Sequence, residues 1–308
     1  MARFLLALLL GETSALVMRA GAAVGLRMRG GSPVATIALD EASEALPFVT
    51  LTNAAGDSAK VYPFGACVTS YVKGDTDYLM VRPDAVVDGS KPISGGIPFC
   101  FPQFGPGAMQ QHGFARNLHW EIASQTDGDA PSVVFKLTDN EYTRAMWDFP
   151  FEALYTVTLG AEALSTEFKV INTGDSELAF TGALHSYWSV SDISNLQIAG
   201  PFEGATYLDK LSDTRLASTS DFVEISKPTD SVYEQVGGEV SLLDSGRKTS
   251  LKIASEGWTD TVVWNPYGEE KMGYAKFVCV ECAKAIMPIV VAPTAEWVGK
   301  MSITPITL

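Results

Sequence analysis

Short segments in which hydrophobic and polar residues alternate recur from about Ile37 to the C-terminus, and turn residues separate them. Many are rich in β-branched and aromatic residues, whereas continuous helical periodicity is scarce. Alternation is typical of strands that bury one face, and many such strands indicate a sandwich or barrel. The clearest segments are Lys60 to Tyr62, Val133 to Leu137, Tyr155 to Leu159, Leu164 to Ile171, Phe180 to Tyr187, Val240 to Leu243, Leu251 to Ile253, Thr261 to Trp264 and Lys276 to Ala283.

The pattern predicts one all-β domain over residues 33–308, a large antiparallel β-sandwich with few short helices. No repeat of fixed period and no linker rich in Pro, Gly or Ser divides this region, and single all-β domains of this size are common. A turn cluster from Asn172 to Asp175 separates two of the segments. We therefore expect Leu164 to Ile171 and Leu178 to Tyr187 to form a hairpin.

The segment from Lys91 to Gly107 departs from the strand pattern. It interleaves glycine and proline with aromatic residues, which predicts an irregular loop whose backbone can approach a ligand closely. Composition alone fits two roles equally, the wall of a binding site and a crossover beneath the core.

The first 32 residues differ in composition from the rest. Arg3 precedes a short apolar run, Phe4 to Leu10, and an arginine-bearing stretch with few acidic residues follows from Leu16 to Ser32. The run is shorter than the ~20 residues of a membrane-spanning helix, and its flanks are typical of a secretory signal followed by a transit peptide. We expect residues 1–32 to be a disordered leader that directs the protein to a plastid; the secretory pathway and the cytoplasm are the alternatives.

The formal net charge of −14 at pH 7 argues against a nucleic-acid partner, because binding a phosphate backbone needs a clustered positive field. An anionic small molecule would instead need a local basic pocket. The chain has four cysteines, too few in a chain of this length for a disulfide framework: Cys67, Cys100, Cys279 and Cys282.

The chain has only three histidines, His112, His119 and His185. This small number limits the choice of a side chain that could act as an acid or base at neutral pH. His185 lies on a predicted strand, and Glu281 ends an apolar run that starts at Phe277. A buried carboxylate needs a partner or a function. Taken singly, a strand histidine is more often a hydrogen-bonded structural residue, and Glu281 could equally end a strand in water.

The spacing of Cys279 and Cys282 suggests a zinc or redox site. Residues three apart in a strand point to opposite faces, however, and no second Cys/His pair has ligand spacing. Phosphate-loop and dinucleotide motifs are also missing from the sequence. We therefore expect neither a metal nor a cofactor.

Six motifs taken together are more specific than any single residue. They are Lys-Pro-Ile-x-Gly-Gly-Ile-Pro from Lys91, Gln-His-Gly-Phe-Ala-Arg from Gln111, Ala-Leu-His-x-Tyr from Ala183, Tyr-Leu-Asp-Lys from Tyr207, Val-Trp-Asn-Pro from Val263 and Cys-Val-Glu from Cys279. In this order they resemble the glucose-6-phosphate 1-epimerase group of the aldose 1-epimerase, or mutarotase, family. The resemblance covers nearly everything after the leader and implies a galactose mutarotase-like supersandwich.

The resemblance implies an isomerase that interconverts the α and β anomers of an aldohexose 6-phosphate. It implies that His185 protonates the ring oxygen and that Glu281 takes the proton of the anomeric hydroxyl. It also implies substrate contacts from Gln111, His112, Arg116 and Asp209.

Elementary chemistry agrees with these roles. Opening a hemiacetal removes a proton from O1 and delivers one to O5, which a base and an acid on opposite sides of the ring can do, each typically worth ~10²- to 10⁴-fold. A resting glutamate anion and histidine cation suit the forward step. No metal, nucleotide or covalent intermediate is required.

The sequence departs from the family at Ser94, where phosphate-specific members usually carry an arginine before the Gly-Gly pair. Serine cannot replace the charge-assisted bonds of arginine to a dianion; Arg116 remains, and Lys91 lies three residues before Ser94. A mutarotase of a free aldose and a noncatalytic carbohydrate-binding sandwich are therefore the alternatives. A glycosidase would need two carboxylates rather than a carboxylate and a histidine.

We expect a monomer that binds a sugar or sugar phosphate and, in its mature form, neither membrane nor nucleic acid.

Overall fold

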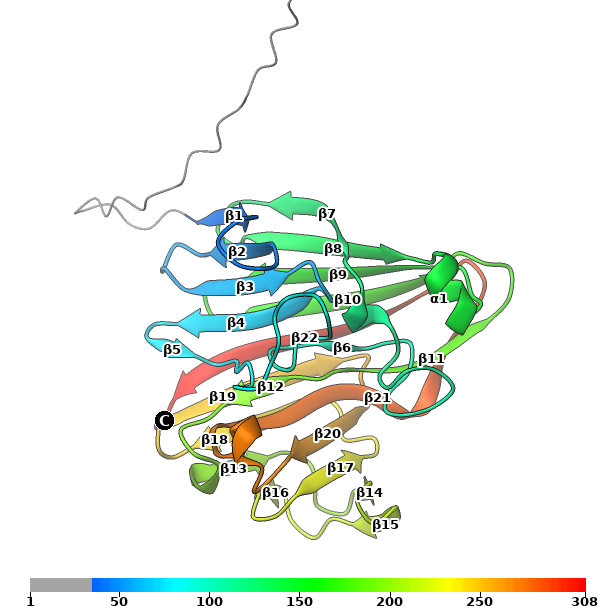
Figure 1. Cartoon of the computed structure of the whole chain (residues 1–308). Helices are drawn as coiled ribbons and strands as arrows, with labels where there is room; N and C mark the ends of the chain where they lie inside the picture. Colours follow the sequence, from blue (N-terminus) through cyan, green and yellow to red (C-terminus); the bar gives the residue numbers. More distant parts are fainter. Residues whose placement is uncertain (1–34) are drawn as a thin grey trace, which may run out of the picture. The chain divides into compact units, whose positions relative to one another are not determined.

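The computed structural model describes residues 35–308, and their strands form three antiparallel sheets (Figure 1). The first sheet follows the chain order, each strand pairing with the next. Its strands are β1 (Thr36–Asp40), β2 (Phe48–Thr52), β3 (Ser58–Tyr62), β4 (Cys67–Lys73) and β5 (Thr76–Asp77).

The second sheet has nine strands drawn from the middle and the end of the chain. Along β9 and β10, buried residues alternate with half-buried ones from the first position to the last, as the sequence pattern predicts. In spatial order the strands are β16 (Phe222–Val223), β13 (Leu196–Ala199), β18 (Glu239–Asp244), β19 (Thr249–Glu256), β22 (Glu296–Thr307), β10 (Leu164–Asn172), β9 (Phe151–Leu159), β8 (Ser132–Thr138) and β7 (Glu121–Thr126).

The third sheet has eight strands, and five residues that line the candidate site lie on them: Tyr187, Asp230, Val262, Trp264 and Glu281. Its central strand, β21, pairs with β20 on one side and with β11 and β12 on the other. The strands are β15 (Thr214–Ala217), β14 (Thr206–Asp209), β17 (Thr229–Tyr233), β20 (Asp260–Asn265), β21 (Phe277–Val291), β11 (Leu178–Leu184), β6 (Phe99–Cys100) and β12 (Tyr187–Ser189).

A bridge between Val68 of β4 and Ile97 connects the first sheet to the segment that leads into β6 of the third. The main apolar core takes residues from all three sheets, so the first and third sheets form one layer and the nine-stranded sheet the other. The segment 91–107 has both of the roles that its composition allows, because it crosses beneath the core and also forms part of a cavity wall. Its Phe99 and Phe101 are fully buried against Phe168 of β10, while Ser94 lines a cavity.

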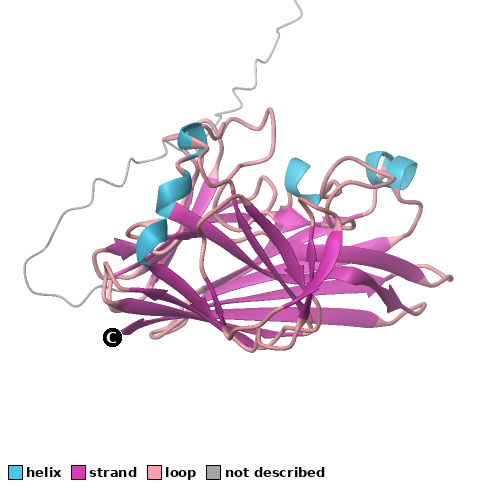
Figure 2. Ribbon diagram, turned by 90° about the horizontal axis from the view of Figure 1, so that it is seen from below, coloured by secondary structure: helices cyan, strands magenta, loops and turns pink. Residues whose placement is uncertain are grey.

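The all-β sandwich with few short helices is confirmed, and Figure 2 shows the helices as short segments in the connections between strands. Within residues 35–308 the helices are α1 (Glu141–Met146) and the 3₁₀ turns η1 (Ala115–Asn117), η2 (Ile193–Asn195), η3 (Glu270–Met272) and η4 (Tyr274–Lys276).

Across the described part of the chain, no helix is long and apolar enough to cross a membrane. The leader expected over residues 1–32 lies outside the described residues and stays a prediction.

The predicted hairpin is wrong. β10 pairs with β9 and β22 in the nine-stranded sheet, whereas β11 pairs with β21 and β6 in the third sheet. The turn cluster, from Asn172 to Asp175, carries the chain from one layer to the other. Alternation identifies which face of a strand is buried, but two successive strands that both bury one face can pack across the core as well as side by side.

A buried aspartate supports the central strand close to the candidate site. The ladder between β11 and β21 shifts register between Phe180 and Gly182, so β21 carries a bulge. Asp260, 2% exposed, accepts the backbone N–H of Ala285 at 2.9 Å and of Ile286 at 3.2 Å. This carboxylate therefore satisfies backbone donors that an irregular ladder leaves unpaired.

We expect Asp260→Ala to lower the free energy of unfolding by about 3 kcal/mol, because it leaves these donors without an acceptor. Chemical denaturation followed by fluorescence measures the change. The control is Asp75→Ala in the exposed turn between β4 and β5, which should change the free energy by less than about 0.5 kcal/mol. Equal effects of the two substitutions would contradict this role of Asp260.

Candidate active site

A cavity of about 220 Å³ lies beside the central strand of the third sheet. This volume is below the roughly 300–1,000 Å³ of pockets for drug-sized ligands, and it suits a single sugar ring. Six residues singled out from the sequence line it together: Ser94, Gln111, His112, Arg116, His185 and Glu281.

His185 lies in a two-residue break between β11 and β12, not within a continuous strand as the sequence pattern predicted. The break pairs instead with the glycine- and proline-rich segment: His185 N–H donates to the carbonyl of Pro98 at 2.9 Å, and Tyr187 N–H donates to that of Gly96 at 2.8 Å. The imidazole stacks on the Tyr187 ring, with centroids 4.9 Å apart and planes at 12°. These contacts fix the orientation of the imidazole.

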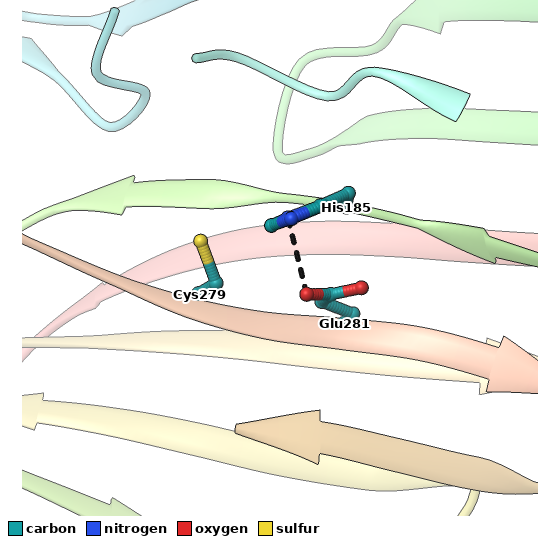
Figure 3. Close-up of side chains that lie close together, drawn as sticks. All are labelled: His185, Cys279 and Glu281. Atoms are coloured by element: carbon teal, nitrogen blue, oxygen red, sulfur yellow. Dashed lines mark ion pairs between the residues drawn. The ribbon is translucent and has the colours of Figure 1, made fainter. Parts of the chain in front are cut away.

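Glu281 lies on β21, and Figure 3 shows its side chain and that of Cys279 rising from one face of that strand toward His185. His185 Nδ1 and Glu281 Oε1 are 3.1 Å apart. Within residues 35–308, neither this Nδ1 nor Glu281 Oε2 has a hydrogen bond of acceptable geometry. The two groups are therefore neighbours, and the expectation that they lie on opposite sides of a sugar ring is wrong. Because O1 and O5 are both bonded to C1, adjacent groups can serve both atoms.

Burial sets the protonation of this pair. Burial lowers the pKa of His185 well below its usual value, and His112, Arg116 and Lys210 lower it further. Burial raises the pKa of Glu281 well above its usual value, with a contribution from Asp230. Both shifts favour the uncharged forms, a protonated carboxyl group beside a neutral imidazole. The sequence-based expectation of a glutamate anion beside a histidine cation has the same number of protons but places the proton on the other partner.

His112 is held as a neutral hydrogen-bonding group. Its Nδ1 accepts the backbone N–H of Gly105 at 3.1 Å and lies 3.0 Å from Cys100 Sγ. Burial, followed by Arg116 and Lys210, lowers the pKa of His112 to about 3. The ring proton is thereby assigned to Nε2, which lies 3.3 Å from the side-chain amide of Gln111. The imidazole can offer this N–H to a sugar oxygen.

Three cationic side chains line the cavity, although the whole chain carries a formal charge of −14. Arg116 donates through Nη2 to the carbonyl of Gln111 at 2.9 Å, and its buried Nε has no partner within residues 35–308. Lys210 Nζ lies 3.5 Å from Asp230 Oδ2. The third cation is Arg82, which is 14% exposed. The cavity is the local basic site that an anionic ligand requires.

The structure does not place Asp209 in the cavity. The carboxylate of Asp209 accepts the backbone N–H of Leu211 at 2.9 Å, which also lowers its pKa. The next residue, Lys210, lines the cavity instead, because successive side chains point to opposite sides of an extended chain.

Seven further residues line the cavity, and four of them carry a charge or a hydroxyl group that the sequence analysis did not single out: Arg82, Tyr187, Lys210 and Asp230. Tyr187 and Lys210 belong to motifs that the sequence analysis quoted, so their positions were available. Arg82 and Asp230 lie outside every motif, and no pattern in the sequence marks them.

His185, Cys279 and Glu281 also form a group that could hold a metal ion, since one ligand atom of each lies within 4.8 Å of the others. Burial raises the pKa of Cys279 well above its usual value, so the thiol is protonated, and a metal would have to displace that proton. The expectation of no metal stays a prediction. Two larger hollows, of about 590 and 690 Å³, lie elsewhere among the described residues, and neither brings a histidine together with a carboxylate.

Comparison with known proteins identifies the family. Residues 47–304 match the sequence profile of aldose 1-epimerase. A protein of Cenchrus ciliaris, provisionally named glucose-6-phosphate 1-epimerase, is 31% identical over 283 residues, which are 84% of this chain and 84% of that protein.

Solved structures agree with this assignment. A crystal structure of a provisionally named mutarotase from Salmonella typhimurium superimposes with a TM-score of 0.80 at 25% identity, over 91% of this chain and 96% of that one. A galactose mutarotase-like protein from Clostridium acetobutylicum shares the fold, with a TM-score of 0.74 at 17% identity over 89% and 99% of the two chains. The predicted mutarotase-like supersandwich is confirmed, and the chain belongs to the aldose 1-epimerase family.

Proposed function

We propose that the protein interconverts the α and β anomers of an aldohexose 6-phosphate, with His185 and Glu281 as its acid and base. The observation that carries the proposal is the contact of His185 Nδ1 and Glu281 Oε1 at 3.1 Å in a sugar-sized cavity lined by three cations. Relatives named for glucose 6-phosphate, among them the Cenchrus ciliaris protein, support the choice of substrate.

Ring opening needs the imidazole to carry a proton when it meets O5 and the carboxylate to be free when it meets O1. Arg116 and Lys210 oppose a positive charge on His185. A bound phosphate would offset these two cations and so favour transfer of a proton from Glu281 to His185. The anionic group of the substrate therefore helps to produce the catalytic form of the pair.

Catalysis is then a proton relay. Glu281 takes the O1 proton as His185 protonates O5, the ring opens, and rotation about the C1–C2 bond presents the other face of the aldehyde. Reclosure returns both protons with the roles reversed. His112 and Gln111 line the cavity beside the pair and are placed to hold sugar hydroxyls.

A mutarotase of a free aldose is the second candidate, because Ser94 lacks the charge that the family resemblance leads us to expect there. The monomeric state, the absence of a nucleic-acid partner and the plastid location stay predictions.

We expect His185→Ala and Glu281→Gln each to lower the rate of anomer exchange of glucose 6-phosphate by at least about a hundredfold, because each removes one proton-transfer group. Magnetisation exchange in NMR measures the rate. The controls are His119→Ala and Glu296→Gln, which change exposed residues that do not line the cavity and should leave the rate unchanged. A near-normal rate in either active-site variant would refute its assigned role.

We expect kcat/KM not to fall in acid until well below pH 6.5. Activity falls in acid when Glu281 and His185 are both protonated, and the lowered pKa of His185 places that limb well below pH 6.5. Activity falls in alkali when the proton that the two groups exchange is lost, and the raised pKa of Glu281 moves that limb well above pH 4.5. The pH profile of kcat/KM checks both limbs, and an acid limb centred at or above pH 6.5 would contradict this description.

We expect Ser94→Arg to improve the preference for glucose 6-phosphate over glucose, because an additional arginine at the cavity wall adds charge-assisted bonds to a dianion. The ratio of kcat/KM for the two sugars measures the preference. An unchanged ratio would place Ser94 outside the phosphate-binding part of the cavity.

A further inference from the structure

Ser94 and Arg82 are neighbours on paired segments of backbone. Arg82 N–H donates to the Ser94 carbonyl at 2.9 Å, and the residues on either side, Val81 and Gly95, form a bridge. Both side chains line the cavity. The positions 82 and 94 therefore reach the same part of the cavity wall from two adjacent segments.

The pairing of these segments is tight. Gly95 has φ +143°, and a Cβ atom there would lie 2.3 Å from the Cα of Val81. Only glycine tolerates this approach. The close packing fixes the position of the backbone that carries Arg82 against the loop that carries Ser94, so neither can shift without disturbing the other.

The guanidinium group of Arg82 is charged and held in one orientation, and its ion pair uses only some of its N–H donors. Its Nε and Nη2 donate to the two carboxylate oxygens of Asp84 at 2.9 and 2.6 Å. Asp84 does not line the cavity. A guanidinium group has five N–H donors, so the pair with Asp84 leaves three of them, and it holds the plane of the group in one orientation.

We propose that Arg82, together with Arg116, binds the phosphate of the substrate, and that Arg82 supplies from the neighbouring segment the cation that is missing at Ser94. This inference rests on the proposed function. Ser94 has a short side chain, which leaves room at the wall for the longer one of Arg82. The unpartnered Nε of Arg116 supplies a second donor, and two arginines match the charge of a phosphate dianion.

The experiment compares Arg82→Ser, Arg82→Lys and the exchanged double variant Arg82→Ser/Ser94→Arg with the parent protein. For Arg82→Ser we expect kcat/KM for glucose 6-phosphate to fall roughly tenfold or more relative to kcat/KM for glucose, because the variant loses a charge-assisted hydrogen bond to the phosphate. Arg82→Lys should lose less, because it keeps the charge but not the fork geometry. The double variant should recover most of the preference.

Arg215→Ser is the matched control. Arg215 also forms an ion pair through Nε, with Glu234 at 2.8 Å, but it does not line the cavity. Its replacement removes the same charge and should leave the preference between the two sugars unchanged. Thermal unfolding of every variant verifies that the protein is folded.

Equal losses for glucose 6-phosphate and glucose in folded Arg82→Ser would overturn the proposal and assign Arg82 a structural role with Asp84. Failure of the double variant to recover any preference would show that positions 82 and 94 do not serve one site.

Titration with inorganic phosphate, followed by calorimetry, separates this inference from the proposed function. We expect the parent to bind phosphate and Arg82→Ser to bind it roughly tenfold more weakly, even if the parent turns over neither sugar. No binding by the parent, or equal binding by the two proteins, would refute the phosphate site.

Discussion

The rest of the site depends on one contact, between a carboxylic acid and an imidazole in the wall of a small cavity lined by cations. Glu281 is 2% exposed, and an ionised carboxylate at such a position costs several kcal/mol unless it is paired. Burial therefore drives the proton onto Glu281 and off His185. An anionic substrate would offset the nearby cations and so favour the charged form of the pair, which the proposed mechanism needs.

The sandwich makes this arrangement possible. β21 runs through the middle of the third sheet, with neighbours on both sides, so Glu281 is held by a strand that cannot move independently. His185 is placed by the break between β11 and β12 and by the loop that crosses from the first sheet. The same loop buries Phe99 and Phe101 in the core. Packing of the core thus fixes the geometry of the site, and the cations around it set its electrostatic character.

The sequence predicted the strands well and their partners poorly. The alternation along β9 and β10 is visible in the sequence because it follows from burial of one face. The layer to which β11 belongs depends on contacts across the core, which a local pattern does not contain. The sequence pointed to His185 and Glu281 because a carboxylate in an apolar run and a rare histidine are chemically conspicuous, and because the motifs around them resemble a family.

The other differences between the sequence-based expectations and the structure arise from tertiary contacts. Asp209 and Lys210 are adjacent, and only the path of the chain after β14 decides which of them meets the cavity. Arg82 belongs to no motif, and only the pairing of its segment with the loop at Ser94 brings it to the wall. The direction of the pKa shifts at His185 and Glu281 likewise follows from burial, which the sequence could not measure.

We propose that this member of the aldose 1-epimerase family opens and recloses the ring of a hexose 6-phosphate by proton transfer through His185 and Glu281. NMR exchange spectroscopy of glucose 6-phosphate with the unmodified protein, beside the same measurement with glucose, tests it most directly. We expect the rate of exchange between the two anomers of glucose 6-phosphate to rise in proportion to protein concentration and to exceed the rate for glucose. Exchange no faster than in protein-free buffer, with the protein folded, would contradict it.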